Sequence, residues 1–86
     1  MTVILDGQYL SDRLTAHDYL KEQLQLPNYY GKNLDALYDL LTECGVTTEI
    51  QLIHSSQLND CGRRIINTIM DCAKNNPAIT FQEKDC

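Results

Sequence analysis

Three carboxylates stand four residues apart near the middle of the chain: Asp35, Asp39 and Glu43. On an α-helix this spacing places them on one side, each about one turn beyond the last. Such a row could supply an acid–base pair for catalysis, or it could accept charge-assisted hydrogen bonds from arginine and lysine side chains of a partner. The helix dipole favours Asp35 in the first turn but accounts for neither of the other two. No lysine or arginine on the same helix face neutralises them.

The apolar positions predict a helix from about Leu34 to Glu43 that turns these carboxylates toward solvent. Its leucines fall within an arc of about 120°, which is a core-facing stripe: Leu34, Leu37, Leu40 and Leu41. The opposite arc carries the polar residues Asp35, Tyr38, Asp39, Thr42 and Glu43. Asn33 can cap the start of this helix, and Gly45 can cap its end.

Tyrosines lie beside the acidic row. Tyr29 and Tyr30 occupy the loop just before the helix, and Tyr38 stands between two of the carboxylates. Exposed tyrosines next to carboxylates are typical of binding hot spots in protein interfaces. An acidic helix face can also be no more than solvated surface, and either loop tyrosine could instead belong to the core. The tyrosines favour an electronegative patch that binds an arginine- or lysine-rich partner.

Catalysis is poorly supported. Asp35 and Asp39 lie one helical turn apart on a convex surface, which offers no desolvated pocket to separate their pKa values. The chain contains no nucleophile motif and no glycine-rich phosphate loop. Arg63 and Arg64 are expected on the solvated side of the last helix, and His17 and His54 are expected to face solvent or the rim of the core. We predict a protein that is not an enzyme and binds no cofactor.

Length and charge narrow the choice of partner. The chain has 86 residues, enough for one domain over 1–86, and its 12 acidic and 7 basic side chains give a net charge of −5. Affinity for a phosphate backbone comes chiefly from lysine and arginine, so this excess of carboxylates argues against binding nucleic acid directly. A basic protein is the better expectation.

Other features indicate a reduced, aqueous compartment. The apolar runs are three or four residues long, against about 20 for a membrane span, and the N-terminus lacks the charged start of a signal peptide. The cysteines are irregularly spaced and the two histidines do not pair with them at zinc-site spacing, so we expect reduced thiols in the cytoplasm and no metal. The cysteines are Cys44, Cys61, Cys72 and Cys86.

The remaining elements are expected to form an α/β fold. Strands are predicted at Thr2–Leu5, Glu49–His54 and Ala78–Gln82, the first of them buried on both faces because nothing polar alternates within it. Helical crossovers between the strands imply a small three-stranded parallel sheet with right-handed connections. We expect two layers, although helices could cover both faces.

Two further helices flank the central one. The first is predicted to begin with a capping box at Thr15 and Asp18, to carry a hydrophobic staple between Leu14 and Tyr19, and to run to about Gln25. The last follows an N-cap at Asn59-Asp60, carries isoleucines at helical spacing, and closes at Asn76-Pro77.

The segment from Leu26 to Thr42, LPNYYGKNLDALYDLLT, resembles the hallmark segment of the barstar family of ribonuclease inhibitors. The similarity is dense over these 17 residues and looser elsewhere. The order of elements also fits the family, as do the opening Val-Ile-x-Asp-Gly pattern and the closing Ala-Ile-Thr strand. The resemblance implies a barstar-like fold and a small cytoplasmic inhibitor, acting as a monomer, that plugs the active site of a secreted, basic microbial ribonuclease.

By position in that family, Asp39 would be the principal mimic of substrate phosphate. Asp35 would contact the rim of the nuclease site, and Tyr29 would pack against its catalytic histidine. The other contact residues implied by the resemblance, together with the neighbours that the spacing adds, are Tyr30, Gly31, Asn33, Tyr38, Thr42 and Glu43.

The chain departs from the family pattern at several positions. The family often has tryptophan where Tyr38 stands and Gly-Trp where this chain has Glu43-Cys44. A further acidic contact on the last helix falls on Cys72, with Asp71 one residue away, and Glu43 could supply the missing charge. The alternative is an immunity protein, or an acidic binding module, for a different basic nuclease or protein.

Overall fold

The computed structural model describes residues 1–84, so the expectation for Cys86 lies outside the described residues. Within this range, strands β1 (Thr2–Asp6), β2 (Thr48–Ile53) and β3 (Ile79–Glu83) form a parallel sheet in the order β1-β2-β3. The register places Val3 beside Ile50, and Ile50 beside Phe81. The predicted three-stranded parallel sheet is confirmed, with each observed strand within one residue of its expected bounds.

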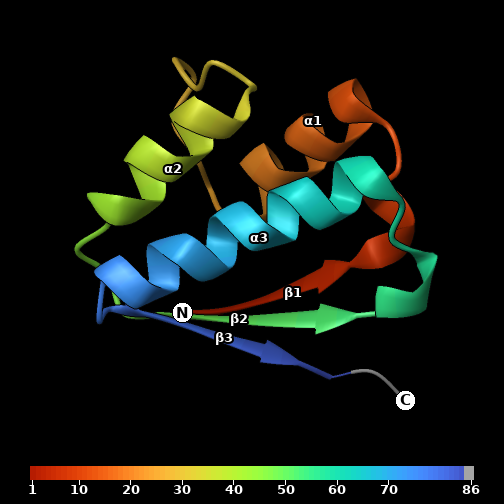
Figure 1. The fold of residues 1–86 in the computed structure, drawn as a ribbon. Coiled ribbons are helices and arrows are strands. Elements are labelled where there is room, and N and C mark those ends of the chain that lie inside the picture. The colour runs from red at the N-terminus through yellow and green to blue at the C-terminus, as the bar shows by residue number, and fades with distance from the viewer. Residues whose placement is uncertain (85–86) are drawn as a thin grey trace.

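Helices cover one face of this sheet (Figure 1). Across residues 1–84 the α-helices are α1 (Arg13–Gln23), α2 (Leu34–Thr42) and α3 (Asp60–Asn75), with short 3₁₀ turns at Gly7–Tyr9 and Ser55–Gln57. The arrangement has two layers, as expected. None of the helices in this range is both long and apolar enough to cross a lipid bilayer.

Burial in the sheet alternates, because only one face is covered. Ile50 and Leu52 are buried beneath the helices, whereas their neighbours Glu49 and Gln51 on the open face are half-buried. In β1, Val3 and Leu5 are buried but Ile4 is 49% exposed. The prediction that the first strand is buried on both faces is therefore wrong, since no second layer covers its other side.

The start of α1 also differs from the prediction. Its N-cap is Asp12, whose carboxylate accepts a hydrogen bond from the Thr15 amide at 3.1 Å. Leu14 is 69% exposed, so it makes no staple with Tyr19. The capping box predicted at Thr15 is wrong because the carboxylate three residues earlier already satisfies that amide.

Asparagine side chains fix both ends of α2. Asn33 caps the start, as predicted, by accepting from the Ala36 amide at 2.7 Å. At the other end, the buried side-chain amide of Asn76 donates to the carbonyls of Leu41 and Cys44, both at 2.9 Å. The prediction of a Gly45 cap is wrong: no glycine among the described residues has a positive φ, and Asn76 satisfies carbonyls that such a cap would otherwise serve.

Replacing Asn76 with alanine should lower the free energy of unfolding by roughly 1–3 kcal/mol, because carbonyls at the end of α2 would lose a buried donor. Urea unfolding followed by circular dichroism measures the change. Asn67→Ala, at an exposed position on the same α3, is the matched control and should shift stability by no more than about 0.5 kcal/mol. Equal effects of the two substitutions would contradict the role given to Asn76.

Candidate functional site

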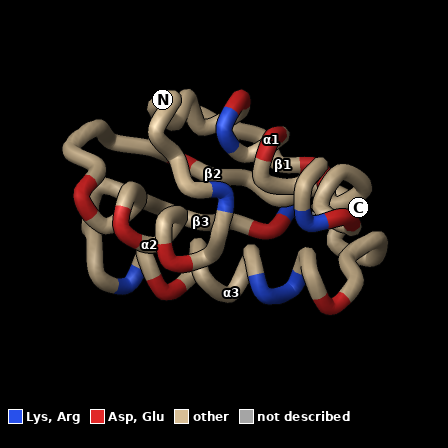
Figure 2. The backbone as a smooth tube through the Cα atoms, turned by 90° about the horizontal axis from the view of Figure 1, so that it is seen from above, with Lys and Arg blue, Asp and Glu red and all other residues tan. Residues whose placement is uncertain are grey.

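The exposed side of α2 carries the three carboxylates, here called the acidic face: Asp35, Asp39 and Glu43. All three are exposed, whereas Leu37 and Leu41 on the opposite side are buried in the core. Figure 2 shows acidic positions recurring along the length of α2 when the molecule is seen from above. The predicted division of this helix into a leucine stripe and an acidic side is confirmed.

No positive side chain among the described residues forms an ion pair with the acidic face. Among residues 1–84, the ion pairs join Lys32 to Asp18 at 2.7 Å and His54 to Asp6 at 3.0 Å. Lys32 stands only three residues before Asp35 in sequence, but its ammonium group is directed to Asp18 on α1. The carboxylates of the acidic face therefore keep their charge available for a partner.

The two loop tyrosines point in different directions. Tyr29 is 81% exposed, whereas Tyr30 is 5% exposed and belongs to the core. The expectation that Tyr30 offers its side chain at the surface is thus corrected by its burial. Tyr38, on α2, is partly exposed, and its hydroxyl accepts a hydrogen bond from the Asn75 amide of α3 at 3.0 Å.

Tyr30 anchors the loop from within. Its hydroxyl is hydrogen-bonded to Nδ1 of His17 on α1, and the two ring centroids are 5.8 Å apart. Burial raises the pKa of Tyr30 to about 12, so its hydroxyl stays protonated at neutral pH. His17 is 2% exposed, which overturns the expectation that it faces solvent or the core rim. This buried pair holds the backbone that presents Tyr29.

The remaining predicted contact residues are Gly31, Asn33 and Thr42, of which Thr42 is half-buried. Gly31 and Asn33 are exposed in the turn that enters α2, and the Asn33 amide also donates to the Gly31 carbonyl at 3.2 Å. The Thr42 hydroxyl donates to the Tyr38 carbonyl at 2.8 Å, one turn earlier on the helix. Tyr29, Gly31, Asn33 and the acidic face thus form one continuous stretch of chain.

Helix α3 adds a carboxylate beside this stretch. Cys72 is fully buried, with its thiol directed to the Tyr38 carbonyl at 3.7 Å, and so it offers no surface contact. Asp71 is exposed, and its carbonyl accepts a hydrogen bond from Asn75, the residue that also holds Tyr38. Asp71 is therefore an exposed acidic position of α3 on the Tyr38 side of α2.

The described residues contain no group of three or more side chains able to hold a metal ion. Their cysteines, Cys44, Cys61 and Cys72, are free thiols. The arrangement is thus a negatively charged helix surface preceded by an exposed aromatic side chain, Tyr29. Its chemistry suits charge-assisted hydrogen bonds to guanidinium and ammonium groups.

A family model and a bacterial protein match parts of this chain. The family model described as "Barstar (barnase inhibitor)" matches residues 1–78. A protein of Bacillus subtilis (strain 168) named "Putative ribonuclease inhibitor YrdF" is 50% identical over 40 residues, which are 46% of this chain and 44% of that protein. The chain therefore aligns with less than half the length of this relative.

The buried His17 predicts a loss of stability in mild acid. Burial lowers its pKa below the usual 6.5, and the nearby Arg13 lowers it further. The folded protein thus holds a neutral imidazole, whereas the unfolded chain takes up a proton below about pH 6.5, so stability falls as the pH drops through the folded pKa. Denaturant titrations from pH 8 to pH 5 should show this decline.

Two variants separate His17 from other titrating groups. His17→Gln should abolish the decline, whereas His54→Gln, at a histidine whose side chain is 49% exposed, should retain it. Carboxylates take up protons at a lower pH than this window. The hydrogen bond from Lys32, for example, lowers the pKa of Asp18 below 3.8. A decline that survives in His17→Gln would show that another group causes it.

Proposed function

The chain belongs to the barstar family, and on that premise we propose that it inhibits a secreted, basic ribonuclease by covering the active site with the acidic face and the loop before it. The family description names an inhibitor of barnase, and the Bacillus relative carries the name "Putative ribonuclease inhibitor YrdF". The proposal extends these descriptions to this chain and assigns the contact surface.

The observation that carries the proposal is the uncompensated charge of α2. A carboxylate on a rigid helix can accept several guanidinium hydrogen bonds, in the way that a substrate phosphate does in a nuclease cleft. Asp39 lies at the centre of the row and serves as the principal phosphate mimic. Asp35 and Glu43, one turn to either side, contact basic groups at the rim.

The loop supplies the apolar part of the contact. Tyr29, 81% exposed in the free protein, gains most from burial and packs against an imidazole or aliphatic surface of the nuclease. Gly31 and Asn33 approach with the loop backbone, and Tyr38 and Thr42 border the carboxylates. Tyr30 is excluded from the contact set because it is committed to the core.

Charge also sets the rate of capture. An acidic surface that approaches a basic cleft is steered by long-range attraction, which raises association above the roughly 10⁵–10⁶ M⁻¹s⁻¹ typical of unsteered pairs. Fast capture suits a protein that protects the cytoplasm of a cell producing a toxic nuclease. One inhibitor monomer per nuclease is the expected stoichiometry.

A second candidate keeps the same surface and changes the partner. Glu43 and the buried Cys72 depart from the family pattern, and they favour a target whose basic groups are arranged differently. An immunity protein for another basic nuclease, or a module for a basic protein, would then use the acidic face. A gene for a small basic nuclease next to this one would favour inhibition of that nuclease.

Asp39→Ala should weaken inhibition of the target far more than Asp71→Ala, an exposed aspartate on α3 outside the row. We expect a loss of about 30-fold or more for Asp39→Ala, the equivalent of about 2 kcal/mol at an interface hot spot. The measurement titrates each variant into barnase or a related basic ribonuclease and follows RNA cleavage. Equal inhibition by both variants would show that α2 is not the contact surface.

Ionic strength provides an independent check. The association rate should fall steeply between low and physiological salt, because screening weakens attraction between exposed charges. Stopped-flow mixing with the ribonuclease measures the rate. A variant with Asp35→Asn, Asp39→Asn and Glu43→Gln together should associate more slowly and with a flatter dependence on salt. An unchanged slope would rule out steering by the acidic face.

A further inference from the structure

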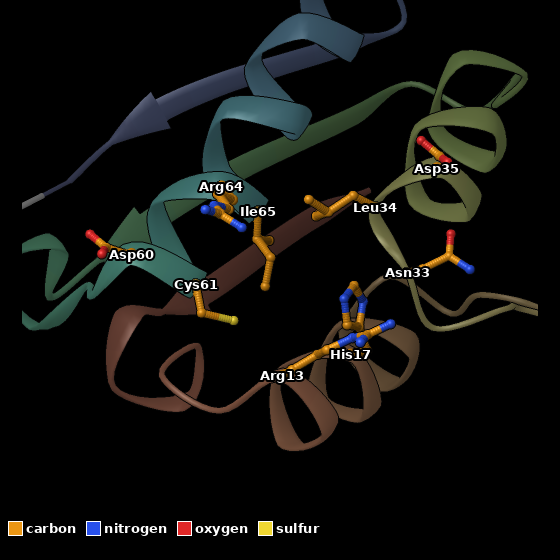
Figure 3. A pocket seen from close by; sticks show the side chains of 9 residues that line it. All are labelled: Arg13, His17, Asn33, Leu34, Asp35, Asp60, Cys61, Arg64 and Ile65. Carbon is orange, nitrogen blue, oxygen red and sulfur yellow. The ribbon is translucent and has the colours of Figure 1, made fainter.

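A cavity of about 570 Å³ opens between the three helices, next to the acidic face (Figure 3). Its wall is formed by Arg13 and His17 of α1, by the start of α2, and by the first turns of α3. Sites for small ligands typically have volumes of this order. The N-terminal turns of all three helices border it.

Two arginines from different helices line this cavity. Arg13 comes from α1 and Arg64 from α3. Within residues 1–84, neither guanidinium group takes part in an ion pair or a side-chain hydrogen bond. Both arginines are exposed, so their guanidinium groups are free to contact a ligand in the cavity. Guanidinium groups bind phosphate oxygens with two parallel hydrogen bonds each.

His17 gives independent evidence of a ligand site. Its side chain is almost entirely buried, and in Figure 3 the imidazole points into the cavity. Nδ1 is bonded to Tyr30, whereas no partner is recorded for Nε2 among the described residues. Since none of their fully buried polar side-chain atoms lacks a partner, Nε2 must reach the open space of the cavity. A polar atom in such a position is available to a bound molecule.

The acidic and apolar residues of the wall restrict the class of ligand. Asp35 and Asp60 also line the cavity, and they would repel a molecule with charge along its whole length. The same carboxylates can accept hydrogen bonds from sugar hydroxyl groups. Leu34 and Ile65 supply apolar surface. The cavity is therefore suited to a ligand that has one anionic group and several hydrogen-bond donors.

We propose that this cavity binds a sugar phosphate of the nucleoside monophosphate class, with the phosphate held between Arg13 and Arg64. The sugar hydroxyl groups donate to Asp35 and Asp60, and His17 contacts the ligand through Nε2. This proposal does not rest on ribonuclease inhibition and can be tested without any nuclease, although Asn33 and Asp35 line the cavity and also belong to the proposed contact surface.

The test is a titration of the full chain with adenosine 5′-monophosphate at low ionic strength, followed by calorimetry and by amide chemical shifts. Saturable binding is expected, with shifts at residues 13–17, 33–35 and 60–65. Adenosine without phosphate should bind at least tenfold more weakly, and inorganic phosphate without sugar should also bind at least tenfold more weakly. Inorganic phosphate binding as tightly as the ester would overturn the sugar-phosphate assignment.

Arginine variants locate the site. Arg13→Gln and Arg64→Gln should each weaken binding at least tenfold. Arg63→Gln is the matched control, because Arg63 is exposed on the same helix but does not line the cavity, and it should change affinity less than twofold. Circular dichroism confirms folding of each variant. The absence of saturable binding up to about 10 mM, or an equal loss in Arg63→Gln and Arg64→Gln, would refute the site.

Discussion

The acidic face depends on a helix that tolerates its own like charges. Each pair of carboxylates four residues apart destabilises the helix by roughly 0.2–0.5 kcal/mol. On the other side, Leu37 and Leu41 are buried, and each contributes roughly 1.5–3 kcal/mol of hydrophobic stabilisation. Burial of the two leucines therefore outweighs the repulsion between the carboxylates. The side chains of Asn33 and Asn76 cap the two ends of α2. The molecule can thus keep concentrated negative charge on a rigid element, where a basic partner can reach it.

In the loop before α2, two neighbouring tyrosine side chains point in opposite directions. Tyr30 turns inward to His17, and its neighbour Tyr29 turns outward to solvent. Lys32, the cation closest in sequence to the acidic face, is drawn aside by Asp18. Each interaction lies outside the row of carboxylates, yet together they determine which side chains the surface displays and which charges remain unpaired.

Sequence periodicity and capping residues correctly predicted several features that depend on contacts between residues close together in the chain. The leucine spacing of α2, its Asn33 cap and the sequence of helices and strands along the chain could be read from the amino-acid sequence, because each follows from helical or strand periodicity and capping chemistry. Contacts between distant residues could not be predicted. Asn76, which lies 31 positions after Gly45, hydrogen-bonds the end of α2 in place of the expected glycine cap. Tyr30, 13 residues after His17, forms a buried hydrogen bond with its imidazole. The exposure of Ile4 depends on a sheet face that no helix covers, which a short apolar run cannot reveal.

Mapping the contact surface in a complex tests the central claim most directly. Amide chemical shifts of the labelled protein, recorded while a catalytically inactive basic ribonuclease is added, should change chiefly from Tyr29 to Glu43. Resonances of the open sheet face, such as those of Gln51 and Gln82, should stay in place. Changes centred on that sheet face, with α2 unaffected, would contradict the account.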